Sequence, residues 1–137
     1  MSMSYKIEEV EGIGPEYGSK LREVDIQTTE DLLRRCGDKK GREGVSTETG
    51  ISEKHLLEWV NLSDLMRING VGEEYADLLE EAGVDTVKEL ATRNAENLSA
   101  AMAEVSEKKN LTDRVPSADT VQGWIDEAGK MDPTVSH

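Results

Sequence analysis

Residues 7–32 read IEEVEGIGPEYGSKLREVDIQTTEDL, and residues 65–90 read LMRINGVGEEYADLLEEAGVDTVKEL. The two stretches align at an offset of 58 residues. Glycines, a tyrosine, a threonine and apolar residues coincide: Ile7, Val10, Gly12, Ile13, Gly14, Tyr17, Leu21, Val24, Ile26, Thr28 and Leu32 align with Leu65, Ile68, Gly70, Val71, Gly72, Tyr75, Leu79, Ala82, Val84, Thr86 and Leu90. Because several residue types agree at one offset, the pattern indicates an internal repeat.

Each copy has the pattern of two helices joined by a glycine turn. A short helix is expected at 7–10 and again at 65–68. Gly-Ile-Gly at 12–14 (the first turn) and Gly-Val-Gly at 70–72 (the second turn) come next. A second helix should then follow, because its apolar residues recur at helical spacing.

The ends of these helices also carry signals. A left-handed helix cap is expected at Gly83 and also at Asp25. This conformation is less favourable for aspartate than for glycine, but it is permitted. Thr28 and Thr86 are expected to cap the helices that come next. The glutamate three residues after Thr86 gives a full capping-box spacing, and the aspartate three residues after Thr28 gives a weaker version.

The remaining segments also read as helices. Asn94 is expected to cap a helix over 95–108, and Pro116-Ser117 should start the last one. Trp59 and Trp124 stand in similar apolar contexts and are expected to be core anchors. No run shows sustained period-two alternation, so no sheet is expected.

These patterns predict an all-α fold of two tandem, pseudo-duplicated units packed as one compact helical domain. We place the first unit at 1–61 and the second at 62–131. Residues 132–137 are expected to be a flexible tail.

The glycine turns resemble the helix-hairpin-helix motif of DNA repair and recombination proteins. The resemblance covers about 30 residues in each unit. The paired arrangement also resembles an uncharacterised bacterial family with two such hairpins, which implies no activity. The motif implies that hairpin backbone grips DNA phosphates, sometimes with a monovalent cation on its carbonyls. By position, those contacts would be Gly12, Ile13, Gly14, Gly70, Val71 and Gly72.

The second turn departs from that DNA-binding pattern. A lysine or arginine usually stands near the start of the second helix, but no base occurs here as far as Ala82. Five acids occupy the segment instead: Glu73, Glu74, Asp77, Glu80 and Glu81. They place negative charge where a phosphate would bind, so the second turn is not expected to bind DNA alone.

The first turn is less hostile to an anion. Lys20 and Arg22 follow it, and a basic cluster at 34–42, which we expect to be a loop, lies further on. The cluster consists of Arg34, Arg35, Lys39, Lys40 and Arg42. It is a candidate nucleic-acid patch, although a solvated loop with arginines at a helix end is the favoured interpretation.

The net charge opposes binding to a polyanion. Sixteen Lys and Arg against 29 Asp and Glu give −13. Counting along the sequence gives −4 for residues 1–60 (nine bases, 13 acids) and −9 for residues 61–137 (seven bases, 16 acids). Such a field repels DNA, although salt near 1 M would shorten the screening length to roughly 3 Å.

Residues 46–59 allow a further interpretation, because their small residue, turn glycine and apolar anchors have helix-turn-helix spacing. Ser52, Glu53, Lys54, His55 and Glu58 would then face the major groove. Their charge is mixed and no arginine is present, which suits base reading poorly. A tight turn that packs two helices together gives the same spacing and is favoured.

No catalytic constellation is apparent. The chain has only two histidines, His55 and His137, and no cluster with metal-ligand spacing. Cys36 is the single cysteine, so no internal disulfide is expected. A reactive thiol beside Arg34 and Arg35 is less favoured than a small residue at a helix end. We therefore expect no enzyme, cofactor, metal or small-molecule substrate.

The sequence also bears on location. The first residues carry no apolar signal core, and no apolar run approaches the roughly 20 residues of a membrane span. These features predict a cytoplasmic protein without membrane contact. The favoured function is a protein-interaction or scaffolding module. The alternative is DNA-backbone binding, without sequence specificity, through the first turn and the basic cluster.

Overall fold

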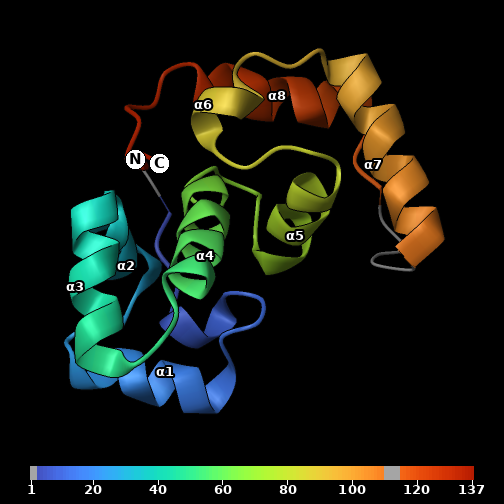
Figure 1. Cartoon of the computed structure of the whole chain (residues 1–137). Helices are drawn as coiled ribbons and strands as arrows, with labels where there is room; N and C mark the ends of the chain where they lie inside the picture. Colours follow the sequence, from blue (N-terminus) through green and yellow to red (C-terminus); the bar gives the residue numbers. More distant parts are fainter. Residues whose placement is uncertain (1–2, 110–114) are drawn as a thin grey trace.

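The computed structural model describes residues 3–109 and 115–137, and within these ranges all regular elements are helices (Figure 1). In chain order they are the 3-10 helix η1 (Ile7–Glu9) and the α-helices α1 (Gly14–Glu23), α2 (Thr29–Cys36), α3 (Lys39–Thr49), α4 (Glu53–Leu65), α5 (Glu73–Glu81), α6 (Val87–Leu90), α7 (Ala95–Lys109) and α8 (Ala118–Ala128). The one β-type pairing in these ranges is an isolated antiparallel bridge between Lys6 and Thr28. The all-α prediction is confirmed.

Helix α4 lies at the centre of the molecule (Figure 1). It packs against α2 and α3 on one side and against α5 on the other, while α8 packs against α6 and α7. Buried apolar side chains from α1 through α8 form one cluster. The boundary expected at residues 61 and 62 falls inside α4, so one continuous helix joins the two halves of the chain.

The two tryptophans are core residues, as the sequence predicts. Trp59 is 2% exposed and Trp124 is 5% exposed. The Trp59 indole nitrogen, Nε1, lies 3.4 Å from the point where a Cβ on Gly12 would be, and Trp124 Nε1 lies 3.5 Å from the same point on Gly70. Each indole therefore packs directly over the first glycine of a turn.

Several main-chain hydrogen bonds recur between residues 58 positions apart. Val10 N–H donates to Ile7 O (3.2 Å) and Ile68 N–H to Leu65 O (3.2 Å); Ile13 N–H donates to Val10 O (3.1 Å) and Val71 N–H to Ile68 O (3.1 Å); Ile26 N–H donates to Leu21 O (3.0 Å) and Val84 N–H to Leu79 O (2.9 Å). The backbone around the first turn is thus hydrogen-bonded like the backbone around the second turn at these positions.

The expected helix caps are present, but the complete capping box forms at Thr28 and not at Thr86, the opposite of what the spacing predicts. Asp25 and Gly83 have positive φ angles of 64° and 97°. Thr28 forms the complete capping box, whereas Thr86 accepts the N–H of Glu89 without a bond in return. The Glu89 carboxylate pairs with Arg93 at 3.1 Å instead. Arg93, three residues beyond the end of α6, thus holds the carboxylate that the spacing predicted to bond back to the cap.

The last six residues differ from the flexible tail expected from their composition. The Ser136 N–H donates to Gly37 O at 2.8 Å, and Thr134 Oγ1 donates to the buried Asp64 carboxylate at 2.9 Å. Val135 is partly buried against the core. Backbone and side-chain partners in α4 and the α2–α3 turn thus hold a segment in which short-range sequence shows no helix or strand signal.

Candidate binding site at the two glycine turns

The two turns share the conformation of their first glycine and differ at their last. Gly12 and Gly70 have φ angles of 91° and 92°, a region that strongly favours glycine. Gly14 has a φ of 62°, whereas Gly72 has an extended conformation with φ −89° and ψ −166°. As a result α1 begins at the last glycine of its turn, and α5 begins one residue after it, at Glu73.

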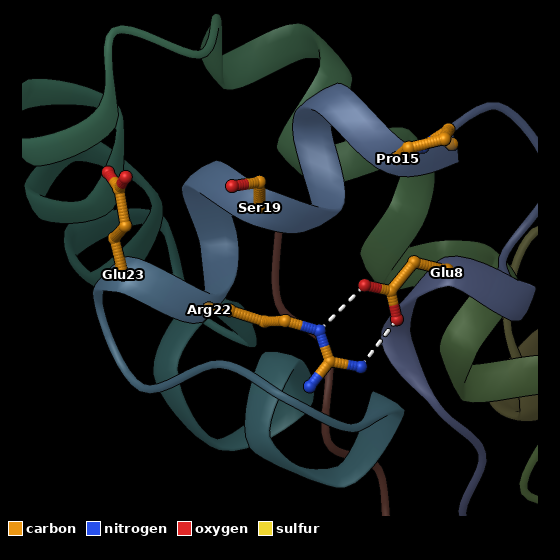
Figure 2. Close-up of a pocket in the computed structure, with 6 residues that line it drawn as sticks. Glu8, Pro15, Ser19, Arg22 and Glu23 are labelled. Atoms are coloured by element: carbon orange, nitrogen blue, oxygen red, sulfur yellow. Dashed lines mark hydrogen bonds and ion pairs between the residues drawn. The ribbon is translucent and has the colours of Figure 1, made fainter.

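A hollow of about 560 Å³ lies beside the first turn, at the start of α1. Figure 2 shows Glu8 and Arg22 pointing toward each other across this hollow, with Glu23 directed away from the pair. Arg22 donates from Nε and Nη2 to the two carboxylate oxygens of Glu8, both at 2.6 Å. A Cβ on Gly18 would lie 2.8 Å from Glu8 Cγ, so glycine there makes room for Glu8.

This pair neutralises the arginine that lines the hollow beside the first turn. The hydrogen bonds from Arg22 lower the pKa of Glu8 to about 2, so its carboxylate is ionised at physiological pH. Bidentate guanidinium–carboxylate pairs use the same donors that would bind a phosphate. The sequence predicted Arg22 as an anion contact but did not predict its pairing with Glu8, because the two residues are 14 positions apart and share no motif.

Carboxylates surround a second hollow, of about 270 Å³, which lies between the two turns. Its lining residues are Glu11, Glu73, Glu74 and Asp77. Burial, followed by repulsion from Glu11, raises the pKa of both Glu73 and Asp77. Residues 11 and 73–77 come from different halves of the chain, so the fold concentrates negative charge at this point. We call this hollow the acidic hollow.

Glu80 extends the same negative field along α5. It is half-buried, and burial, followed by repulsion from Glu58, raises its pKa to about 7 from an ordinary value of 4.5. Because the folded protein binds this proton more tightly than the unfolded chain does, protonation favours folding.

Stability is therefore expected to fall as pH rises from about 4.5 through 7, the window set by the two pKa values of Glu80. Glu80→Gln removes the charge and should raise stability at pH 8 by on the order of 1 kcal/mol, after allowance for solvent screening. Urea unfolding across this pH window checks it, with the exposed Glu43→Gln as the matched control. A Glu80→Gln profile as steep as the wild-type one would contradict the assignment.

The expected basic loop is wrong, because two helices contain this segment. Residues 34–36 end α2, residues 39–42 begin α3, and only a two-residue connection separates them. The Asp38 side chain accepts the N–H of Gly41 and so caps α3. Aspartate is a preferred N-cap residue, so Asp38 was a helix-start signal that could be found in the sequence.

The arginines of this cluster already have partners within the molecule. Arg34 pairs with Asp31 at 2.7 Å, and Arg35 donates to the Val24 carbonyl at 2.8 Å. Arg42 is only 3% exposed and donates to three main-chain carbonyls, which disfavours its expected role as an anion contact. A buried guanidinium with satisfied donors does not reach a phosphate without unfolding its surroundings.

Three of the predicted anion contacts are lysines that form no ion pair among the residues that the structure describes. Lys20 lies over the Tyr17 ring, with Nζ 5.9 Å from its centroid, while Lys39 and Lys40 are exposed at the start of α3. The positive charge available to a ligand on the first half is thus smaller than its composition indicates.

The connection between α3 and α4 forms a tight helical corner. Gly50 has a φ of 77°, and Ser46 Oγ donates to Ile51 O at 2.6 Å. The His55 ring stacks on Trp59 with centroids 5.6 Å apart and planes at 9°. Residues of the segment with helix-turn-helix spacing thus pack two helices together, which is the interpretation that the sequence favours.

Cys36 is fully buried, and burial raises the pKa of its thiol to about 11. This favours its interpretation as a packing residue, since the thiolate is the reactive form. In the described ranges, no three His, Cys, Asp or Glu side chains are grouped to hold a metal ion. None of the described helices is both long and apolar enough to cross a bilayer.

Comparison with known proteins places the chain in a family. Residues 11–131 match the family model described as a domain of unknown function, DUF4332. The chain belongs to the DUF4332 family. The match begins at the residue before the first turn and ends just after α8, so this DUF4332 domain includes both glycine turns and both tryptophans. No curated protein and no solved structure matches the chain.

Proposed function

We propose that this DUF4332 chain is a non-enzymatic protein-interaction module built from two helix-hairpin-helix units. Its binding surface is the acidic hollow between the two turns. The partner is a protein segment rich in lysine or arginine. The observation that carries this proposal is that both turns contribute carboxylates to one hollow, whereas the arginines of the first half are held by internal partners.

Matched geometry supports the two-unit description. Gly12 and Gly70 have the same φ within one degree, and each is covered by the indole of its own tryptophan. Tyr17 and Tyr75 lie against these indoles, with ring centroids 5.0 and 5.3 Å apart. Repeated hydrogen bonds at the 58-residue offset add to this likeness. The last glycines differ, because Gly14 has a positive φ angle and Gly72 is extended. We therefore expect the two turns to bind different ligands.

The charge of the acidic hollow supports a cationic partner. Two unit charges 4 Å apart interact by about 4 kcal/mol at an effective dielectric of 20, before desolvation is counted. Burial, and after it repulsion from Glu11, raises the pKa of Glu73 and of Asp77, so a cation in the hollow would offset part of the cost of keeping these carboxylates charged. A phosphate at the same place would add to that repulsion.

DNA-backbone binding at the first turn is the second candidate. The observation in its favour is the hollow at Gly14, next to the helix start, with Lys20 on the following turn of α1. Helix N-termini with free N–H groups hold phosphate oxygens. Against it stand Glu8, which occupies Arg22, and Pro15, which has no N–H.

Fluorescence anisotropy with two labelled probes separates the candidates. The probes are a short lysine-rich peptide and a DNA duplex, each titrated at about 50 mM salt and again at higher salt. We expect the peptide to bind, and we expect Glu73→Gln, Glu74→Gln and Asp77→Asn together to weaken it at least roughly tenfold, as 1.4 kcal/mol of lost attraction would do.

The matched control neutralises three exposed carboxylates away from the hollow: Glu43→Gln, Glu96→Gln and Glu107→Gln. This triple change makes the net charge less negative by the same three units as the test variant, so the peptide affinity should fall clearly less if binding occurs at the hollow. Equal weakening by both triple variants would refute a site at the hollow. Duplex binding that Lys39→Ala and Lys40→Ala weaken would support the DNA candidate instead.

A further inference from the structure

The last six residues of the sequence cross from one half of the molecule to the other. In Figure 1 this segment leaves the end of α8 and runs down beside the α2–α3 end of the fold. It contacts the α2–α3 turn through Ser136 and the end of α4 through Thr134. The chain therefore returns from its last helix to elements formed in its first half.

Arg42 holds one end of this segment. Its Nη2 donates to Ser136 O at 2.7 Å, and its Nη1 donates to Cys36 O and Gly37 O, both at 3.0 Å. The Ser136 N–H donates back to Gly37 O at 2.8 Å. One buried guanidinium thus joins the end of α2 to the main chain of residue 136, and the Ser136 side chain takes no part in these bonds.

Arg67 and Asp64 hold the other end. Arg67, which is 8% exposed, donates from Nη1 to Asp64 Oδ1 at 2.8 Å and to Asp132 O at 3.0 Å. Asp64 also accepts the Thr134 hydroxyl at 2.9 Å and the Val87 N–H at 2.9 Å. A single buried carboxylate at the end of α4 therefore fixes both α6 and the segment.

The space beside the α2–α3 turn is shaped for this main chain. A Cβ on Gly37 would overlap two main-chain carbonyl oxygens, that of Leu33 in the preceding turn of α2 and that of Thr134. Gly37 has an ordinary helical φ of −63°, so these two close contacts, and not its φ angle, favour glycine here. A side chain at this position would therefore disturb both the end of α2 and the approach of residue 134.

We infer that residues 132–136 form a strap, which closes the α2–α3 turn onto the end of α4 and which two buried arginines hold by its main chain. Arg42 lies in α3 and Arg67 in the turn that follows α4, and both donate guanidinium hydrogen bonds to strap carbonyls. Two separate parts of the fold thus hold the same segment. Opening the strap leaves these donors and the Gly37 carbonyl without strap partners. It therefore acts as a latch that locks the two halves in one arrangement. This inference is independent of the proposed function.

Two substitutions in the full chain test the strap at Ser136. Ser136→Pro removes the N–H that Gly37 O accepts, whereas Ser136→Ala keeps both main-chain groups. Cys36, the single cysteine, reports opening, because it is buried beside the Arg42 contact. We expect Ser136→Pro to raise the rate of thiol modification in native buffer roughly tenfold and Ser136→Ala to leave it unchanged.

Low concentrations of urea distinguish strap opening from global unfolding, because a local opening exposes little surface and depends weakly on denaturant. A wild-type rate in Ser136→Pro, an equal rise in both variants, or a urea dependence as steep as that of global unfolding would each overturn the inference.

A second pair of variants keeps the test decisive if Ser136→Pro does not fold. Thr134→Val removes the hydroxyl that Asp64 accepts, and Thr134→Ser retains it. Amide hydrogen exchange at Ser136 should be slower in the wild type than in an unstructured chain and faster in Thr134→Val, with Thr134→Ser near the wild type. An unprotected Ser136 amide in the wild type would overturn the strap.

Discussion

Replacing Trp59 by alanine is expected to lower the free energy of unfolding by about 3–5 kcal/mol, the range for large core aromatics. Trp59 is 2% exposed, covers Gly12 of the first turn and makes an edge contact with Tyr17 at 5.0 Å. The substitution therefore leaves a cavity directly under the turn. Since small domains have about 5–15 kcal/mol of stability in total, the variant should be near its unfolding threshold.

Urea unfolding followed by far-ultraviolet circular dichroism measures this loss. Trp59→Phe is the control, because it keeps an aromatic ring in the site and should lose clearly less. Trp124→Ala should fall in the same range as Trp59→Ala, since Trp124 covers Gly70 in the same way. A loss below about 1 kcal/mol for either alanine variant would mean that the indole does not support its turn.

Asp64→Asn is expected to have an effect of similar size, about 3–5 kcal/mol, because it breaks a buried ion pair from one side. Asp64 is 1% exposed and accepts bonds from Arg67, Thr134 and Val87. Asparagine keeps the size and removes the charge, so the Arg67 guanidinium is left buried without its carboxylate. The lost stability comes from the hydrogen-bond network that joins α4, α6 and the strap.

Glu104→Gln is the matched control for that measurement. Glu104 pairs with Lys108 at 3.0 Å, but the two side chains are 67% and 72% exposed. Exposed pairs of this kind contribute little, so the change should stay within about 0.5 kcal/mol. Equal losses in Asp64→Asn and Glu104→Gln, both measured by urea unfolding, would show that the buried network does not hold the halves together.

The fold was largely predictable because its signals are local. Helix periodicity, the Asn94 and Ser117 caps and the positive φ at Asp25 and Gly83 all depend on residues within about one helical turn of each other. The tryptophan positions were predictable for a related reason. Each tryptophan stands among apolar residues at helical spacing, and this local pattern predicts a buried side chain.

The candidate site was less predictable because its contacts join distant residues. The pairs Glu8–Arg22 and Arg42–Ser136 are separated by 14 and 94 positions, and neither belongs to a spacing rule. Arginine counts therefore overstated the positive charge available on the first half. The acids after the second turn were identified correctly in sequence, but their meeting with Glu11 required the fold.

Charge also explains why the two turns should differ in function despite their shared first glycine. Gly14 opens onto a hollow that contains the internal Glu8–Arg22 pair, whereas Gly72 leads straight into Glu73 and Glu74. A helix N-terminus favours such acids electrostatically. The second turn therefore stabilises its own helix with the groups that make it repel a phosphate.

Mapping the ligand by NMR tests the central claim most directly. Amide spectra of the labelled full chain would be recorded during parallel titrations with the lysine-rich peptide and with the DNA duplex. Shifts that the peptide causes at Glu11 and at 73–77, with few changes at 14–22 and at 39–40, are the expected result. Shifts that the duplex causes at 14–22 and 39–40, with the acidic hollow unaffected by the peptide, would contradict the account.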